Sequence, residues 1–275
     1  MIRLLAVALL GLLLGVTKAA AAETVSFLGD GVTLKGVLYS PAGRGPFPAV
    51  VALHGCGGLY GRDGAMSPRH ADWAEHLTRE GFVVLFPDSF GSRGAGAQCQ
   101  TEDRVTRPSR ERVADALAAK AYLQSRREVK PEAISLLGWS NGGSTVLYAV
   151  QASRNVNDGR PDFARAVAFY PGCRAPAERD NWHARMPLLI LIGAADDWTP
   201  SQPCEALAAA ARSAGEPVTI VLYPGAYHDF DHPNLSTHTL TDLAYTGDGG
   251  GRAHTGTNPA ARHDALARVP AFLAR

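Results

Sequence analysis

The sequence Gly138-Trp139-Ser140-Asn141-Gly142-Gly143 directly follows the apolar run 133–137 and opens a run of small residues typical of a helix. This order of buried strand, tight turn and helix is typical of a nucleophile elbow, in which the serine occupies the turn. The serine must adopt a strained backbone conformation that pushes its hydroxyl clear of the sheet, so the residues two positions to either side must be small. Gly138 and Gly142 meet this requirement. We therefore predict Ser140 as a nucleophile, and a plain strand–helix turn punctuated by glycine is the alternative.

Strand and helix patterns alternate along the rest of the chain. Strands are expected as a hairpin over 23–41 and at 47–53, 82–87, 133–137, 164–170, 187–192 and 218–223. Helices are expected at 67–80, 109–127, 200–214 and 260–275, and the polar stretch 232–259 is expected to be a long surface loop. Such alternation predicts an α/β fold with a doubly wound, mostly parallel sheet, helices on both faces and the hairpin at one edge. Ligands bind such sheets at the carboxyl ends of the strands.

A glycine-rich motif, His54-Gly55-Cys56-Gly57-Gly58, follows the expected strand 47–53. Backbone N–H groups that point at the oxyanion of a tetrahedral intermediate give acyl transfer its largest stabilisation. A loop at this place supplies one such N–H, and the residue after the nucleophile supplies the other. We assign them to Cys56 and Asn141, with His54 bracing the loop by hydrogen bonding. A tight turn or a phosphate cradle is the alternative, although the GxxxxGKS/T pattern of phosphate loops is missing.

An acid and a histidine follow later strands at positions suited to activate Ser140. Asp196 lies three residues past the glycine that follows strand 187–192, the usual offset for the acid that orients a catalytic histidine. Asp197 is the alternative acid, or else a helix-start acid or a loop ligand. His228 follows the last strand and can accept the serine proton there. The chain order Ser140, Asp196, His228 is that of α/β-hydrolases.

Charge and histidine spacing argue against other classes of function. The chain has 27 basic and 26 acidic residues, so its bulk field attracts neither nucleic acid nor an anionic membrane. His228 and His232 flank Asp231 and invite a metal site. Catalytic zinc needs three convergent ligands, however, and no helix is expected here to align the two histidines. We therefore expect no metal. Three further histidines are expected to be solvent-exposed: His238, His254 and His263.

The first residues have the pattern of a secretory signal peptide. Met1-Ile2-Arg3 is a short positive start, 4–16 is almost wholly apolar, and Ala20-Ala21-Ala22 has the form of a cleavage site. We expect residues 1–22 to be removed and residues 23–275 to form a single catalytic domain, exported most simply to a bacterial periplasm. An uncleaved membrane anchor is the alternative, although the apolar stretch is shorter than the roughly 20 residues of a membrane-spanning helix.

Four cysteines in an exported chain favour disulfides. No CxxC pair is present, which argues against a zinc site. Cys56 and Cys99 follow the third and fourth expected strands, which should be neighbours in the sheet. Cys173 and Cys204 follow the sixth and seventh in the same way. We therefore predict the disulfides Cys56–Cys99 and Cys173–Cys204, with free buried thiols as the alternative.

Five motifs together resemble the dienelactone hydrolase family of α/β-hydrolases. They are HGCGG at 54–58, FPDSFGSRG at 86–94, GWSNGG at 138–143, IGAADDWTP at 192–200 and AYHDF at 226–230. The resemblance runs from about Thr24 to the C-terminus. It implies an eight-stranded sheet without a large cap domain and no cofactor. The short spacing from Tyr170 to Pro187 agrees, because it leaves no room for a sizeable lid.

The resemblance also bears on the substrate. An arginine after the Pro-Asp motif of the family helps to bind a substrate carboxylate, and Arg93 follows Pro87-Asp88 similarly, with a loop salt bridge as the alternative. The best-known members carry cysteine at the elbow, where this chain has Ser140. They also carry an acidic residue soon after the first loop strand, where this chain has His54-Gly55-Cys56. These differences favour a broader ester or lactone hydrolase.

The expected function is therefore an exported serine hydrolase that cleaves a small carboxylic ester or lactone through an acyl-enzyme. Trp139 and Trp198 are expected to line the substrate pocket, with packing as the alternative for each. Two other classes of function stay open. One is a peptidase or acyltransferase on the same fold, and the other is a non-catalytic binding protein. The complete triad argues against the binding protein.

Overall fold

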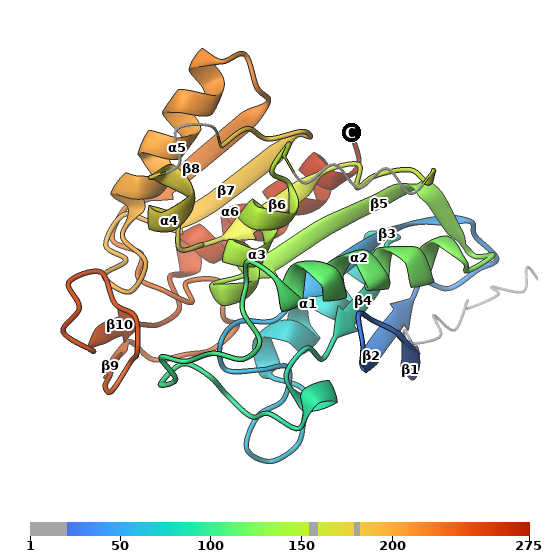
Figure 1. Cartoon of the computed structure of the whole chain (residues 1–275), viewed down its shortest axis with the longest axis horizontal. Coiled ribbons are helices and arrows are strands. Elements are labelled where there is room, and N and C mark those ends of the chain that lie inside the picture. The colour runs from blue at the N-terminus through green and yellow to red at the C-terminus, as the bar shows by residue number, and fades with distance from the viewer. Residues whose placement is uncertain (1–20, 154–158, 179–181) are drawn as a thin grey trace, which may run out of the picture.

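An eight-stranded sheet runs through the molecule in the order β1-β2-β4-β3-β5-β6-β7-β8 (Figure 1). This computed structural model describes residues 21–153, 159–178 and 182–275. The strands are β1 (Ala21–Leu28), β2 (Thr33–Ser40), β3 (Phe47–Leu53), β4 (Val83–Pro87), β5 (Val129–Trp139), β6 (Ala166–Phe169), β7 (Leu188–Gly193) and β8 (Val218–Tyr223). The β1–β2 and β2–β4 pairs are antiparallel, and the other pairs are parallel. The predicted sheet, mostly parallel with a hairpin at one edge, is confirmed.

The first strand reaches into the predicted signal peptide. β1 begins at Ala21, which pairs with Ser40 of β2, two residues ahead of the predicted first mature residue Glu23. The rest of the predicted signal peptide, residues 1–20, lies outside the described residues.

Helices cover both faces of the sheet. They are α1 (Pro68–Arg79), α2 (Glu111–Gln124), α3 (Asn141–Ala149), α4 (Arg174–Ala177), α5 (Ser201–Ser213) and α6 (Pro259–Leu273), with a short 3-10 helix η1 (Gly91–Arg93). In Figure 1, α2 and α3 lie in front of the sheet and α6 passes behind it. A 2.8 Å contact between His76 Nε2 of α1 and the Leu266 carbonyl of α6 places these two helices on the same face. Among the helices that the structure describes, none is both long and apolar enough to cross a membrane.

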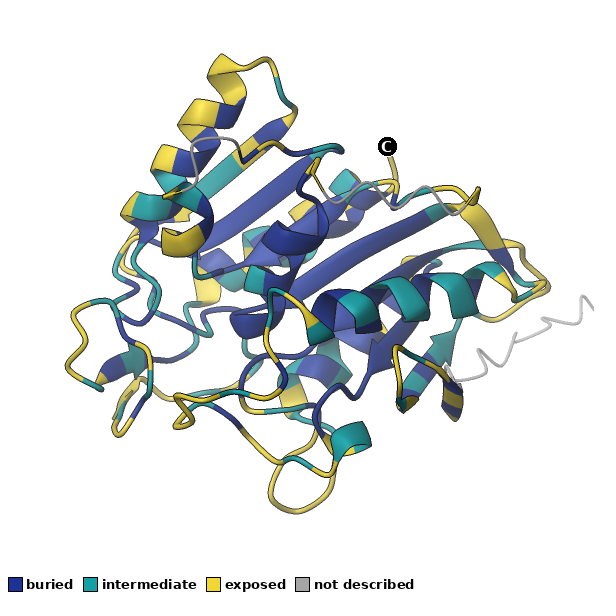
Figure 2. Cartoon of the chain, viewed as in Figure 1, coloured by how far each residue is buried: buried dark blue, intermediate teal, exposed yellow. Residues whose placement is uncertain are grey.

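The core lies along the central strands (Figure 2). Every residue of β4 and of β7 is buried, as expected when a continuous apolar run is covered by helices on both sides. The hairpin strand β2 instead alternates between buried and more exposed positions over much of its length. The core therefore holds β3, β5 and β7 in place. The motifs at 54–58, 138–143 and 192–200 lie at the carboxyl ends of these three strands.

The stretch predicted as a long loop is partly ordered into strands. Within residues 232–258, here named the 232–258 segment, β9 (His238–Leu240) and β10 (Ala253–Thr255) form a two-stranded antiparallel sheet. Strands of three residues are too short to show a periodic pattern in the sequence, and this is why they were not predicted. The segment is anchored to two other loops, because Ala244 N–H donates to the Cys99 carbonyl and Gly247 N–H donates to the Asp197 carbonyl.

Both predicted disulfides are present. Cys56 is bonded to Cys99 with a Cα–Cα distance of 4.9 Å, and Cys173 is bonded to Cys204 with a Cα–Cα distance of 5.0 Å. The pairing followed from strand order, because β3 neighbours β4 and β6 neighbours β7 in the sheet. No cysteine is left as a free thiol, since all four lie in described parts of the chain.

Candidate active site

Ser140 occupies a strained turn between β5 and α3. Its backbone has φ 52° and ψ −113°, a conformation that costs a residue with a side chain about 1–3 kcal/mol. A Cβ atom at Gly138 would lie 2.3 Å from the Gly142 carbonyl oxygen, and one at Gly142 would lie 2.1 Å from the Leu53 carbonyl oxygen. The two glycines therefore allow the close backbone approach that the elbow requires.

His228 is held by Asp196 at the carboxyl end of the sheet. The Nδ1 atom of His228 lies 2.8 Å from Oδ2 of Asp196, and both side chains are buried. Oδ1 of the same carboxylate accepts the N–H groups of Trp198 at 3.0 Å and Thr199 at 2.8 Å. Burial alone would lower the pKa of His228, but the charge and hydrogen bond of Asp196 outweigh it, so the pKa is raised above its usual value.

The other ring nitrogen of His228 is free to take up a proton. Nε2 is buried and has no hydrogen-bond partner among the described residues, so the Ser140 hydroxyl does not donate to it in this structure. Such hydrogen bonds are often long in free enzymes and shorten when substrate binds. The Trp198 ring lies 4.6 Å from the His228 ring, centre to centre, and Trp198 shares one cavity with Ser140. The loops that carry Ser140 and His228 are therefore adjacent.

A cavity of about 780 Å³ opens above the elbow. Its lining includes Cys56, Ser140, Asn141, Trp198, Thr199 and Tyr245. The residues come from the loops after β3, β5 and β7 and from the 232–258 segment, so the cavity lies at the carboxyl edge of the sheet as predicted. A volume of this size is typical of sites for small molecules.

The two predicted oxyanion residues face this cavity together. Neither the Cys56 N–H nor the Asn141 N–H donates a hydrogen bond to any residue that the structure describes, so both are available to an anionic oxygen. His54 braces the loop before Cys56, with its Nδ1 2.8 Å from the Gly55 carbonyl. Burial lowers the pKa of His54 well below its usual value, so the ring is neutral and its Nδ1–H can donate to that carbonyl.

The second candidate acid has a different partner. The Asp197 carboxylate accepts the His254 backbone N–H at 2.8 Å and lies 2.7 Å from Nδ1 of the same residue. Asp197 is therefore a loop ligand, one of the readings left open for it, and Asp196 is the carboxylate that contacts His228. His254 was expected to be exposed, but it is half-buried in β10 because this pairing ties the 232–258 segment to the β7 loop.

Two predicted substrate-binding residues lie outside the cavity lining. Trp139 belongs to β5, has no exposed surface and donates its indole N–H to Asp231 at 2.7 Å. Residues alternate between the two faces of a strand, so the side chain before the elbow points into the core. Arg93 donates to both carboxylate oxygens of Asp115 at 2.8 Å and is thus held in a salt bridge, the alternative considered for it. Trp198 does line the cavity.

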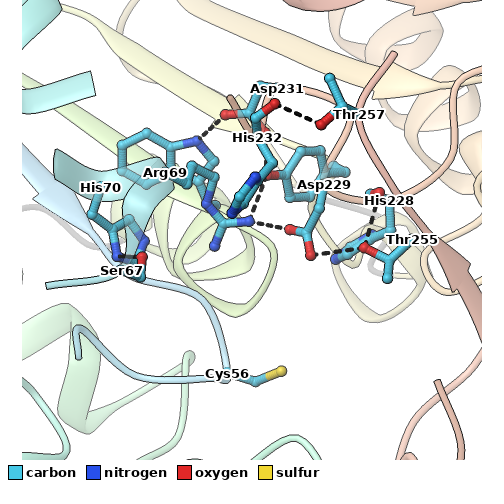
Figure 3. A network of polar contacts seen from close by, with 12 residues as sticks. Cys56, Ser67, Arg69, His70, His228, Asp229, Asp231, His232, Thr255 and Thr257 are labelled. Atoms are coloured by element: carbon cyan, nitrogen blue, oxygen red, sulfur yellow. Dashed lines mark hydrogen bonds and ion pairs between the residues drawn. The ribbon is translucent and has the colours of Figure 1, made fainter. Parts of the chain in front are cut away.

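A largely buried polar network beside His228 was not predicted (Figure 3). Asp231 accepts three hydrogen bonds, from the indoles of Trp73 and Trp139 and from the Tyr170 hydroxyl. Arg69 of α1 donates to the Tyr170 hydroxyl at 3.1 Å and forms an ion pair with Asp229. Burial would raise the pKa of Asp229, but Arg69 outweighs it and the pKa is strongly lowered. This ion pair fixes the residue after His228, where φ is 60°.

Arg112 is a second residue that the sequence analysis missed. It is completely buried, and its guanidinium donates to the Asn141 side-chain oxygen at 2.5 Å and to the His54 carbonyl at 2.7 Å. Helical spacing could have found it, because an arginine stands on the apolar face of the helix. Arg112 is spaced at helical intervals with Ala116, Ala119 and Leu123, and the other buried residues of α2 are Val113, Asp115 and Lys120.

The described residues form no cluster of side chains that could bind a metal ion. Across residues 21–153, 159–178 and 182–275, no group of three or more His, Cys, Asp or Glu side chains is arranged to hold one. His232, considered above as a ligand, instead has its Nδ1 3.1 Å from the Asn234 N–H, which donates to it.

Comparison with known proteins gives a family match over most of the chain. The Dienelactone hydrolase family matches residues 34–275. A Synechocystis sp. protein named as a carboxymethylenebutenolidase is 25% identical over 218 residues, which cover 75% of this chain and 85% of that protein. A Bacillus subtilis protein named as the hydrolase YtaP is 32% identical over 112 residues, which cover 36% of this chain and only 38% of that protein.

Solved structures of low sequence identity share the fold. A Klebsiella pneumoniae structure named as a dienelactone hydrolase has a TM-score of 0.69 at 19% identity, covering 94% of this chain and 100% of that one. A dienelactone hydrolase-like promiscuous phosphotriesterase from metagenomic libraries has a TM-score of 0.67 at 19% identity, covering 94% and 98%. Thermogutta terrifontis esterase 2, phosphorylated by paraoxon, has a TM-score of 0.64 at 21% identity, covering 93% and 94%.

Proposed function

Because the chain belongs to the dienelactone hydrolase family, we propose that it hydrolyses a carboxylic ester or lactone through Ser140, His228 and Asp196. The observation that carries the proposal is the 2.8 Å contact from His228 to Asp196 on loops beside the strained Ser140 turn. Relatives named carboxymethylenebutenolidase and structural neighbours named esterase support this substrate class.

In the first half of the reaction the enzyme is acylated. His228 Nε2, which has no hydrogen-bond partner among the described residues, takes the proton of the Ser140 hydroxyl as Oγ attacks the carbonyl carbon. The carbonyl π electrons move onto oxygen, and the N–H groups of Cys56 and Asn141 stabilise the oxyanion. The tetrahedral intermediate collapses, the C–O bond to the alcohol breaks, and His228 gives its proton to the leaving alkoxide.

In the second half, water repeats the same sequence on the acyl-enzyme. His228 takes a proton from water, hydroxide adds to the acyl carbon, and the bond to Ser140 Oγ breaks as the proton passes to that oxygen. The carboxylic acid leaves and the serine is restored. Asp196 orients the ring throughout, because its carboxylate favours the tautomer with hydrogen on Nδ1 and stabilises the protonated imidazole.

A covalent probe tests the nucleophile. A fluorophosphonate should label the wild-type chain and fail to label Ser140→Ala. Ser144→Ala is the matched control, because Ser144 lines the same cavity four residues along the chain. Ser144→Ala should still be labelled, because the Ser144 hydroxyl hydrogen-bonds to two backbone groups, the Ser140 carbonyl and the Gly172 N–H, and takes no part in the attack. Labelling of Ser140→Ala at the wild-type rate would contradict the proposal.

A substrate panel separates an esterase from a peptidase on the same fold. We expect turnover of short acyl p-nitrophenyl esters and small lactones and none of peptide anilides. Removal of Ser140 leaves only the oxyanion donors and binding, so the Ser140→Ala variant should lose most of the rate, about 10⁶-fold as in a serine protease with the same kind of triad. Faster cleavage of the anilides than of the esters would favour the peptidase.

Export of the chain is part of the same proposal. Two disulfides are typical of oxidising compartments, and the first 22 residues have the signal-peptide pattern. N-terminal sequencing of the chain recovered from a periplasmic fraction should begin at Glu23. An intact Met1 in the cytoplasmic fraction would contradict it.

A further inference from the structure

One disulfide lies in the loop that carries a proposed oxyanion donor. Cys56 is bonded to Cys99, and Cys56 lines the same cavity as Ser140. A hydrogen bond runs beside the disulfide, because the Gln98 N–H donates to the Cys56 carbonyl at 2.7 Å. The loop after β4 therefore holds the peptide unit that follows Cys56 and, through the disulfide, the Cys56 side chain.

Packing alone holds this loop weakly on its far side. A Cβ at Gly57 would meet nothing within 4 Å, and one at Gly58 would touch only Phe90 at 4.0 Å. Gly58 has φ 90°, in the region that favours glycine. The local contacts of this peptide unit are those of the Gly55 carbonyl with His54 and with the Gly58 N–H. Glycine carries the largest conformational entropy in a flexible chain, so a restraint from another part of the chain should help to keep the Cys56 N–H pointing into the cavity.

Such a restraint comes from a cluster of loops outside the main core, in addition to the contacts made by His54 and Arg112. This loop cluster consists of Cys56, Trp198, Leu243 and Ala253, with Cys99 and Leu240 packed against it. Its members follow β3, β4, β7 and β8, so no single strand or helix sets the position of Cys56. The Cys99 carbonyl accepts the Ala244 N–H at 3.0 Å, which extends the connection into the 232–258 segment.

We propose that the Cys56–Cys99 disulfide positions the Cys56 N–H for oxyanion stabilisation and so sets the rate of acyl transfer. The inference rests on the proposed function. Cys56 and Cys99 are positioning residues here, since the sulfur atoms act only through the backbone of Cys56. The second disulfide, Cys173–Cys204, closes a loop of similar length, with a sequence separation of 31 against 43. Its entropic effect on stability is therefore similar, and it provides a matched control.

Two double variants test the proposal at a temperature where circular dichroism shows both to be folded. Cys56→Ala/Cys99→Ala should lower kcat for p-nitrophenyl acetate about 10- to 100-fold, below the loss of about 10²- to 10³-fold for complete removal of a donor. KM should change by less than about threefold, because the donor acts mainly in the transition state. Cys173→Ala/Cys204→Ala should keep kcat within about twofold of wild type while losing a similar amount of thermal stability.

A transition-state analogue separates positioning from general loosening of the fold. A trifluoromethyl ketone forms a hemiketal on serine whose oxygen occupies the oxyanion site. Its inhibition constant should rise by the same factor as kcat/KM falls in Cys56→Ala/Cys99→Ala and should stay at the wild-type value in the control. Unchanged kcat in Cys56→Ala/Cys99→Ala, or equal losses in both double variants, would overturn the proposal.

Reduction of folded protein covers the case in which Cys56→Ala/Cys99→Ala does not fold. The control variant Cys173→Ala/Cys204→Ala has Cys56–Cys99 as its only disulfide. Dithiothreitol reduces this disulfide to two thiols and is itself oxidised to a cyclic disulfide. Activity should fall on reduction and return on reoxidation, and full activity of the reduced folded chain would overturn the inference. Wild-type activity in Ser140→Ala would instead contradict the proposed function, and this inference would then lose its basis.

Discussion

The guanidinium of Arg112 donates a 2.5 Å hydrogen bond to the side-chain oxygen of Asn141, the residue after the elbow serine. The same group donates to the His54 carbonyl at 2.7 Å, so one buried side chain joins the two segments that carry the proposed oxyanion donors. Burial lowers the pKa of Arg112 to about 9, which still leaves it charged at neutral pH. Through Arg112, α2 therefore holds these two segments in position relative to each other.

Substitution of Arg112 should lower both stability and rate. Arg112→Met fills a similar volume but leaves the Asn141 side-chain oxygen and the His54 carbonyl without a donor, at about 1–3 kcal/mol for each. We expect the free energy of unfolding, measured by urea titration, to fall by that sum, and kcat to fall with it. Arg110→Met is the control, since that side chain is 77% exposed and surface changes cost less than about 0.5 kcal/mol. Equal stability of the two variants would contradict this prediction.

The two adjacent aspartates should differ sharply in their effect on catalysis. Asp196→Asn keeps the shape of the side chain but favours the wrong tautomer of His228, so kcat should fall by about 10⁴-fold, as in other triads. Asp197→Asn loses only its contact with the half-buried His254 and should change kcat by less than about threefold. Steady-state ester hydrolysis measures both, and a larger loss in Asp197→Asn would reverse the assignment of the acid.

Most of the fold, and the place of the candidate site on it, could be predicted because local rules dominate there. The apolar runs of β3, β4 and β7 are buried on both faces, so composition alone marks them as strands. Ser140, Asp196 and His228 follow β5, β7 and β8, and parallel strands bring their carboxyl ends to one edge of the sheet. The same reasoning paired the cysteines correctly.

Residues whose role depends on distant partners could not be predicted in this way. Trp139 precedes the nucleophile, yet strand alternation turns it toward Asp231, which lies 92 residues away in the sequence. Arg112 bonds to Asn141 across 29 residues, and no local pattern names that partner. The 232–258 segment is held by contacts with several other loops rather than by periodic apolar positions, so its strands and its place beside the cavity appear only in three dimensions.

The pH dependence of activity should follow the state of the His228 ring. The ring must be unprotonated at Nε2 to accept the serine proton, and its pKa is raised above 6.5, with Asp196 outweighing burial. The kcat/KM for ester hydrolysis should therefore rise with pH and reach half its maximum above pH 6.5. In Asp196→Asn burial dominates, so NMR titration should show the His228 pKa below 6.5. His70 is an internal control, since burial lowers its pKa well below 6.5 in both chains. An unchanged His228 pKa in Asp196→Asn would contradict the assigned cause.

Tyr245 of the 232–258 segment lies between two cavities. It lines both the catalytic cavity of about 780 Å³ and a neighbouring one of about 260 Å³. Its hydroxyl donates to the Glu102 carbonyl at 2.6 Å, and the Arg104 guanidinium lies 4.7 Å from its ring centre. The ring is therefore held in place between the catalytic cavity and the neighbouring space.

Removal of the ring should join the cavities and change the size of ester accepted. Tyr245→Ala should raise the ratio of kcat/KM for p-nitrophenyl octanoate to that for the acetate by about tenfold, the scale on which pocket contacts discriminate between chain lengths. Tyr245→Phe keeps the ring and loses only the hydrogen bond to Glu102, so its ratio should stay close to that of wild type. If Tyr245→Phe raises the ratio as much as Tyr245→Ala does, the prediction is contradicted. Selectivity would then depend on the hydrogen bond from Tyr245 to Glu102 that positions the 232–258 segment, and not on the ring as a barrier between the cavities.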